Sequence, residues 1–144
     1  MKIAVEIPSV PYAHRLHGYA GRCSRIHGHN AKVTAVFEGE PDDRGFVVDF
    51  YTVRHSLSSA LATLDHTLVI AESDPLAKTL SDAGEPFAAF PFSPTAENLA
   101  AYIMRVVSKD QSYSSPSHPV ELVSVEWQEE LGFSATVARH PRRG

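Results

Sequence analysis

The chain has 144 residues, of which 43% are hydrophobic, and a formal net charge of −4 at pH 7. This length suits one domain with a proper core, so we expect a single domain over residues 1–144, of which residues 140–144 form a basic tail. The mild negative charge argues against a broad nucleic-acid-binding surface. No apolar run has the length of a membrane span or the form of a signal peptide, and a single cysteine excludes an internal disulfide, so a cytoplasmic location is predicted.

The N-terminal part of the chain predicts two strands. Apolar residues alternate over residues 3–7 and are followed by Pro8 and Pro11. Because proline cannot donate to a ladder, this pattern predicts an irregular or edge strand. Residues 31–40 alternate cleanly between apolar and polar side chains, which predicts a second strand ending in the polar turn of residues 39–45.

The middle of the chain predicts two helices and a loop. After Asp49, a plausible N-cap, apolar residues recur at steps of three and four, so a helix is expected to run to about Leu64. A second helix is expected after Thr95, which can cap it, with an apolar stripe over residues 99–106. Residues 108–119 are rich in Ser and Pro and predict a loop.

The C-terminal part predicts a β-hairpin over residues 120–139, with its turn at Gly132. Val123, Val125 and Trp127 are expected to form the row that faces the core, and a further step of two reaches Glu129. Strands first, helices between them and a hairpin last predict an α+β fold, in which an antiparallel sheet carries helices on one face.

The segment RCSRIHGHN, residues 22–30, places two histidines on either side of one glycine. His27 and His29 point to the same face if a strand begins there. A third histidine would complete an open zinc site of the catalytic kind, whereas a closed structural site is disfavoured because the chain has one cysteine. We choose His14 because it returns to the pair across a short loop, while His55 lies off the apolar stripe of its helix. Two surface histidines without a metal are the alternative.

Three further groups could carry chemistry beside such a metal. Cys23 is a candidate base or nucleophile, since a dication and nearby arginines favour a thiolate; a fourth metal ligand and an inert core thiol are the alternatives. Asp65 and His66 could relay a proton, although sequence neighbours rarely bond each other directly. Glu129 could accept two hydrogen bonds from a guanine-like or pterin edge, or be an exposed turn carboxylate.

Six short elements occur in order over most of the chain: AHRL, CSRIHGHN, VVDF, LDH, PTAEN and a late V-x-W-x-E. Together they resemble the family of 6-pyruvoyl-tetrahydropterin synthase and 6-carboxy-tetrahydropterin synthase, the latter of the queuosine pathway. The Cys-x3-His-Gly-His element discriminates best, and PTAENLA comes next. The resemblance implies a tunnelling fold (T-fold), in which each subunit contributes a four-stranded antiparallel sheet with two helices on one face. It also implies a homo-oligomeric barrel, often a hexamer of two trimers.

The resemblance also implies a role for each candidate residue. The ligands of Zn²⁺ would be His14, His27 and His29. The catalytic set, assembled across a subunit interface, would be Cys23, Asp65 and His66. The pterin would be anchored by Glu129 in a pocket lined by the motif of Thr95.

The implied substrate is a small molecule, 7,8-dihydroneopterin triphosphate, and no nucleic-acid or membrane partner is expected. Zinc would polarise the side-chain oxygens while Cys23 moves protons, and the arginines near Cys23 would contact phosphate. The pyruvoyl synthase loses triphosphate, and the carboxy synthase also releases acetaldehyde. We favour the carboxy synthase as the commoner bacterial activity. The alternatives are the pyruvoyl synthase, a non-catalytic pterin- or metal-binding member, and a cysteine hydrolase, which would leave HGH without a role.

Three positions depart from the pattern of the family. Glu130 stands where the family commonly has threonine after the anchoring glutamate. TLVIAESDP follows His66 in place of the usual leucine and asparagine, and PYAHRL differs from the usual phenylalanine and double alanine before His14. None of these changes removes a predicted ligand or the thiol.

Overall fold

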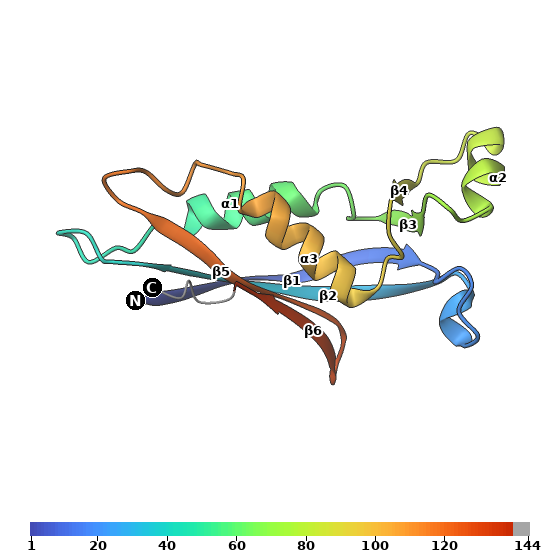
Figure 1. Ribbon diagram of the computed structural model, residues 1–144, viewed down its shortest axis with the longest axis horizontal. Helices are drawn as coiled ribbons and strands as arrows, with labels where there is room; N and C mark the ends of the chain where they lie inside the picture. Colours follow the sequence, from blue (N-terminus) through green and yellow to red (C-terminus); the bar gives the residue numbers. More distant parts are fainter. Residues whose placement is uncertain (140–144) are drawn as a thin grey trace.

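The computed structural model describes residues 1–139, so the predicted basic tail, residues 140–144, lies outside the described residues. The elements in chain order are β1 (Lys2–His14), the 3-10 turn η1 (Arg22–Ser24), β2 (His27–Gly39), α1 (Phe50–Leu61), β3 (Thr67–Ala71), α2 (Leu76–Ala83), β4 (Ala88–Phe90), α3 (Ala96–Val107), β5 (Val120–Glu130) and β6 (Phe133–Ala138). The strands form one six-stranded sheet in the order β4-β3-β1-β2-β5-β6, and α1 and α3 cross one of its faces (Figure 1).

The antiparallel part of the sheet agrees with the sequence prediction. Strands β1, β2, β5 and β6 pair antiparallel in that order. The hairpin between β5 and β6 turns at Gly132, whose φ of 90° is strained for any residue with a Cβ. The predicted sheet was too small, however, because β3 and β4 extend it beyond β1 in parallel pairing. Both strands are short, and the run of residues 68–71 is apolar without alternation, so no period-2 pattern marks them.

Strand β1 is the irregular strand rather than the edge strand of the prediction, since it continues to His14 and lies inside the sheet. Its register with β2 shifts between Ile7 and Val10, so Pro8 falls where the ladder is already interrupted. Strand β3 pairs with β1 only over Tyr12–His14, which leaves Pro8 without a neighbouring strand on that side. These two features let a strand that contains proline occupy a position inside the sheet.

The two predicted helices begin where expected. The side chain of Asp49 accepts a hydrogen bond from the Tyr51 amide at 2.7 Å, and that of Thr95 accepts one from the Asn98 amide at 3.3 Å. Helix α1 ends at Leu61, before the predicted Leu64. A third helix, α2, was not predicted; it lies at the end of the molecule that carries β3 and β4 (Figure 1). Within residues 1–139 no helix is long and apolar enough to cross a membrane.

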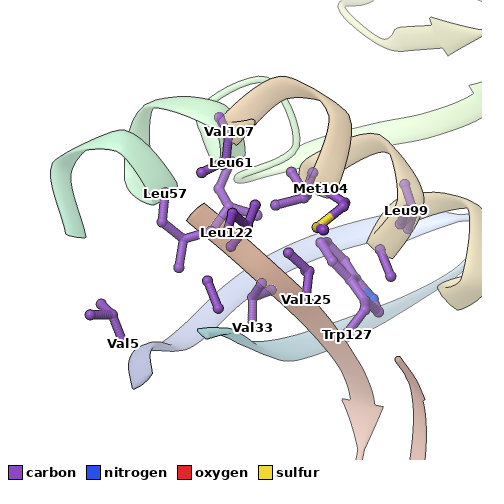
Figure 2. Close-up of a cluster of buried hydrophobic side chains, with 14 of the residues drawn as sticks. Val5, Val33, Leu57, Leu61, Leu99, Met104, Val107, Leu122, Val125 and Trp127 are labelled. Carbon is purple, nitrogen blue, oxygen red and sulfur yellow. The ribbon is translucent and has the colours of Figure 1, made fainter. Parts of the chain in front are cut away.

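The hydrophobic core fills the space between the sheet and helices α1 and α3 (Figure 2). Strand β5 contributes Leu122, Val125 and Trp127, all of them nearly or fully buried. Val123 is only half-buried, so its predicted place in the core row is wrong. The register between β2 and β5 shifts at this point, which inserts one residue and resets the alternation. Counting from Val125 is correct and places Glu129 on the inward row.

Candidate active site

Three histidines lie together where β1 ends and β2 begins. Antiparallel pairing puts His14 directly opposite His27, and His29 follows two residues later on the same face of β2. The side-chain nitrogens that could bind a metal lie within 4.8 Å of one another. His14 is only 2% exposed, so this cluster reaches into the interior. The choice of His14 to join the pair agrees with this arrangement.

The hydrogen bonds of the cluster suit a metal ion. Nδ1 of His14 lies 2.7 Å from the carbonyl oxygen of Pro94, and Nδ1 of His27 lies 2.7 Å from that of Arg25. A carbonyl can only accept, so each neutral ring carries its proton on Nδ1 and presents a lone pair at Nε2. The two Nε2 atoms are 3.1 Å apart. Facing lone pairs repel, whereas two nitrogen ligands of a tetrahedral zinc ion lie about 3.3 Å apart.

The pKa of His14 supports the same protonation state. Burial lowers this pKa, because a charged imidazolium loses hydration inside the protein, and the neighbouring His27 and His29 lower it further. The hydrogen bond to Pro94 and the negative charge of Glu129 act in the opposite direction but are smaller than the effect of burial. The neutral imidazole is the form that binds metals.

A cavity of about 440 Å³ adjoins the cluster and brings together half of the predicted site residues. Its lining includes His14, Cys23, Thr95 and Glu129. This volume is typical of pockets that bind small molecules. Cys23 is half-buried in η1, and its carbonyl oxygen accepts a hydrogen bond from the Leu16 amide at 2.7 Å, which ties this turn to the end of β1.

The carboxylate of Glu129 is held by a tyrosine that the sequence analysis missed. The hydroxyl of Tyr12 donates to Glu129 Oε1 at 2.7 Å, and this oxygen lies 3.8 Å from Nε2 of His14. Burial raises the pKa of Tyr12, and the hydrogen bond to Glu129 raises it further, so the phenol keeps its proton. The step of two from Tyr12 to His14 was the available signal, because it puts both side chains on one face of a strand.

Asp65 and His66 lie apart from this cavity. Nδ1 of His66 is 2.9 Å from Asp65 Oδ1, a direct contact of the kind that sequence neighbours rarely form. The side chain of Asp65 is 51% exposed and that of His66 is 81% exposed. His66 lines a separate hollow with Tyr12 and His29, and among residues 1–139 neither Asp65 nor His66 lines the cavity of Cys23.

The backbone of His66 adopts an unusual conformation. Its φ of 55° is the left-handed conformation, and it is the one residue other than glycine among residues 1–139 with a positive φ. Its amide donates to the carbonyl oxygen of Pro11 at 2.6 Å, which fastens the residue beside β1. This conformation costs on the order of 1 kcal/mol for a residue with a side chain, and such strain is concentrated at functional sites.

The basic residues around the cavity are only partly free. Arg15 is bound to the buried carboxylate of Asp74 through two nitrogens, with its Nε at 2.7 Å from Oδ2. This pairing fastens the segment before α2 to the end of β1 and commits the guanidinium of Arg15 to Asp74. Arg22 and Arg25 are exposed beside Cys23 and stay candidates for the predicted phosphate contacts.

A model of the 6-pyruvoyl tetrahydropterin synthase family matches residues 3–140 of this chain. This match covers nearly the whole sequence and includes all the site residues described above. The chain therefore belongs to the 6-pyruvoyl tetrahydropterin synthase family, as the motif resemblance predicted.

Individual relatives and structures agree with this assignment. A Halobacterium salinarum protein named a probable 6-carboxy-5,6,7,8-tetrahydropterin synthase is 32% identical over 85% of this chain and 77% of its own length. The 6-carboxy-5,6,7,8-tetrahydropterin synthase of Aquifex aeolicus is 29% identical over 72% of this chain and 68% of its own. The structure of Caenorhabditis elegans 6-pyruvoyl tetrahydropterin synthase superposes with a TM-score of 0.67 at 25% identity, over 97% of each chain. The predicted T-fold is confirmed.

Proposed function

We propose that this protein is a zinc-dependent lyase that converts 7,8-dihydroneopterin triphosphate to 6-carboxy-5,6,7,8-tetrahydropterin, with release of acetaldehyde and triphosphate. The observation that carries the proposal is the cluster of three histidines, of which His14 lines a cavity that Cys23 and Glu129 also line. The names of the Halobacterium and Aquifex relatives favour the carboxy synthase over the pyruvoyl synthase. In that role the protein belongs to the queuosine pathway.

Glu129 is the proposed anchor for the pterin ring. Glu129 lies near the C-terminal end of β5 and lines the cavity. A pterin presents a ring N–H beside an amino group, and two such donors match the two oxygens of a carboxylate. Thr95 lines the same cavity; its oxygen accepts one hydrogen bond from Asn98, and its hydroxyl keeps a proton and a second lone pair for the ligand.

His14, His27 and His29 are the proposed zinc ligands. Three imidazoles leave one position open, as in catalytic zinc sites. The bound ion would supply Lewis acidity to the oxygens of the substrate side chain. Cys23 lines the cavity beside His14, which is where a proton must be taken from or returned to that side chain.

Asp65 and His66 are the proposed second half of the proton-transfer set. Their side chains are exposed and line hollows different from the cavity of Cys23. We therefore propose a homo-oligomer in which the Asp–His pair of one copy faces Cys23 of a neighbouring copy. The exposed backbone of β6 at the edge of the sheet, next to the cavity, gives such a neighbour a place to pair.

The test is incubation of the zinc-loaded protein with 7,8-dihydroneopterin triphosphate, followed by identification of the products. The proposal predicts 6-carboxy-5,6,7,8-tetrahydropterin together with equimolar acetaldehyde and triphosphate. A pyruvoyl pterin without acetaldehyde would favour the second candidate, 6-pyruvoyl-tetrahydropterin synthase, whose name the C. elegans structure carries. No turnover by fully zinc-loaded protein would contradict both activities and leave a pterin- or metal-binding protein.

A further inference from the structure

Tyr12 occupies the space between the histidine cluster and the candidate pterin anchor. Its Cα is paired with that of His29 across β1 and β2. Its ring meets His14 edge-on, with 5.1 Å between the ring centroids and an interplanar angle of 67°. The side chain is only 4% exposed. A tyrosine in this place either fills space or holds one of its neighbours in position.

The direction of its hydrogen bonds shows that it holds Glu129. Nε1 of Trp127, which can only donate, lies 3.4 Å from the Tyr12 oxygen. The phenol has a single proton, and its oxygen lies 2.7 Å from Glu129 Oε1. The Tyr12 oxygen therefore accepts from Trp127 and gives its own proton to Glu129. The hydrogen bonds therefore run from Trp127, one of the core residues labelled in Figure 2, through Tyr12 to Glu129, which lines the cavity.

The position of Glu129 makes such a restraint necessary. The residue lies near the end of β5, close to the turn at Gly132, where the β5–β6 register is irregular. Its side chain is 21% exposed, so packing holds only part of it. A carboxylate must keep a fixed plane to accept two parallel hydrogen bonds from one planar ligand. The hydrogen bond from the buried phenol restrains the orientation of the carboxylate and occupies one lone pair of Oε1, so each oxygen keeps a lone pair for one donor of the ligand.

We propose that Tyr12 is a positioning residue for substrate binding: its hydroxyl holds the Glu129 carboxylate in the plane that receives the ring N–H and amino donors of the pterin. The inference rests on the proposed function, because that function supplies the pterin as ligand. Tyr12 acts through Glu129 and needs no contact with the substrate itself.

The test compares Tyr12→Phe with a matched variant, Tyr113→Phe. Tyr113 is 6% exposed, and its hydroxyl donates to the Val107 carbonyl oxygen at 2.9 Å, at the opposite end of α3 from the cavity. Both changes remove one buried phenol hydroxyl and keep the ring. The probe is neopterin, titrated against zinc-loaded protein by its fluorescence, and the zinc content of each variant is measured beside it.

Tyr12→Phe should weaken neopterin binding by about tenfold or more, the usual effect of losing a hydrogen bond to a charged group. KM for 7,8-dihydroneopterin triphosphate should rise by a similar factor, while kcat changes by less than about threefold, because a ground-state contact is lost. Zinc should stay at about one ion per chain. Tyr113→Phe should bind neopterin as the unchanged protein does.

Two outcomes would overturn the inference. Tyr12→Phe could bind neopterin within about twofold of the unchanged protein, in which case the hydroxyl only satisfies Trp127 and Glu129. Alternatively, Tyr113→Phe could weaken binding equally, in which case the loss comes from a softened core. If the unchanged, zinc-loaded protein itself binds no neopterin, the proposed function fails before any variant is compared, so the two failures are distinguishable.

Discussion

The site around the cavity and the corner that carries Asp65 and His66 are built in opposite ways. The first is formed by the central strands β1, β2 and β5, and its polar groups are buried or half-buried and include two hydrogen-bonded pairs: His14 with Pro94, and Tyr12 with Glu129. The second follows the end of α1 and is exposed, with His66 in a strained conformation. We infer that the first is organised within one chain, whereas the second is completed by another copy.

Removing a metal ligand should have the largest effect on the site around the cavity. His27→Ala leaves two imidazoles, so zinc affinity should fall by at least about 100-fold and turnover should be lost with it. His55→Ala removes an exposed histidine from α1 and should change neither quantity. Zinc per chain after dialysis against a weak chelator measures the effect. Full zinc occupancy in both His27→Ala and His29→Ala would refute the ligand assignment.

A change at the Cys23 thiol separates catalysis from metal binding at the same site. Cys23→Ala should lower turnover of 7,8-dihydroneopterin triphosphate by about 10²- to 10⁴-fold, because a proton-transfer group is removed. Zinc should remain at about one ion per chain, since three histidines suffice to hold it. Rates and metal content are measured on the same preparation. Unchanged turnover would show that Cys23 has no catalytic role.

Mixed oligomers test whether Cys23 of one copy and His66 of another form a shared active site. His66→Ala and Cys23→Ala should each be nearly inactive alone. If His66 serves the cavity of a neighbouring copy, co-expression of the two variants should restore activity at about a quarter of the sites, because those sites receive both unchanged residues. Co-purification through two different tags controls for mixing. Mixed oligomers as inactive as their parents would place both residues in one subunit's site and contradict the shared arrangement.

The smallest expected effect concerns the anchoring of the segment after His66. Asp74→Asn breaks the buried pair with Arg15 and should lower the free energy of unfolding by about 2 kcal/mol. The matched change, Asp82→Asn, removes the exposed partner of Lys78 and should cost less than about 0.5 kcal/mol. Urea unfolding at pH 7 measures both variants. Equal losses would show that the buried pair anchors nothing.

The contribution of Asp74 to the free energy of unfolding should also depend on pH, in a defined direction. The hydrogen bond from Arg15 holds the pKa of Asp74 below its ordinary value of 3.8. A carboxylate whose pKa is lowered by folding contributes its stability above the unfolded value and loses it as pH falls through the folded value. The stability difference between unchanged protein and Asp74→Asn should therefore be flat above about pH 5 and shrink below about pH 4. A difference that grows on acidification would contradict this assignment.

The sequence predicts best where function depends on local spacing. His27 and His29 share a face because they are two apart in a strand, and His14 joins them because β1 and β2 pair as neighbours. Glu129 was reached by counting in steps of two from Trp127. The same count was wrong at Val123 because the register shifts between Leu122 and Ser124, and such an insertion leaves no mark in the alternation.

Contacts between distant segments could not be read from spacing. Strands β3 and β4 are short and pair in parallel, so their place in the sheet depends on the crossover through α2. The bond between Tyr12 and Glu129 joins residues 117 positions apart. The left-handed backbone of His66 could not be read from spacing either, because this conformation is uncommon for a residue other than glycine.

The central claim is that one cavity holds both the metal and the pterin ring. It is tested most directly by diffraction at the zinc absorption edge from crystals of the zinc-loaded protein grown with neopterin. The account predicts one anomalous peak at about 2.0–2.1 Å from a ring nitrogen of His14, His27 and His29, with the pterin amino group hydrogen-bonded to Glu129. Zinc bound elsewhere, or a pterin ring that does not contact Glu129, would contradict it.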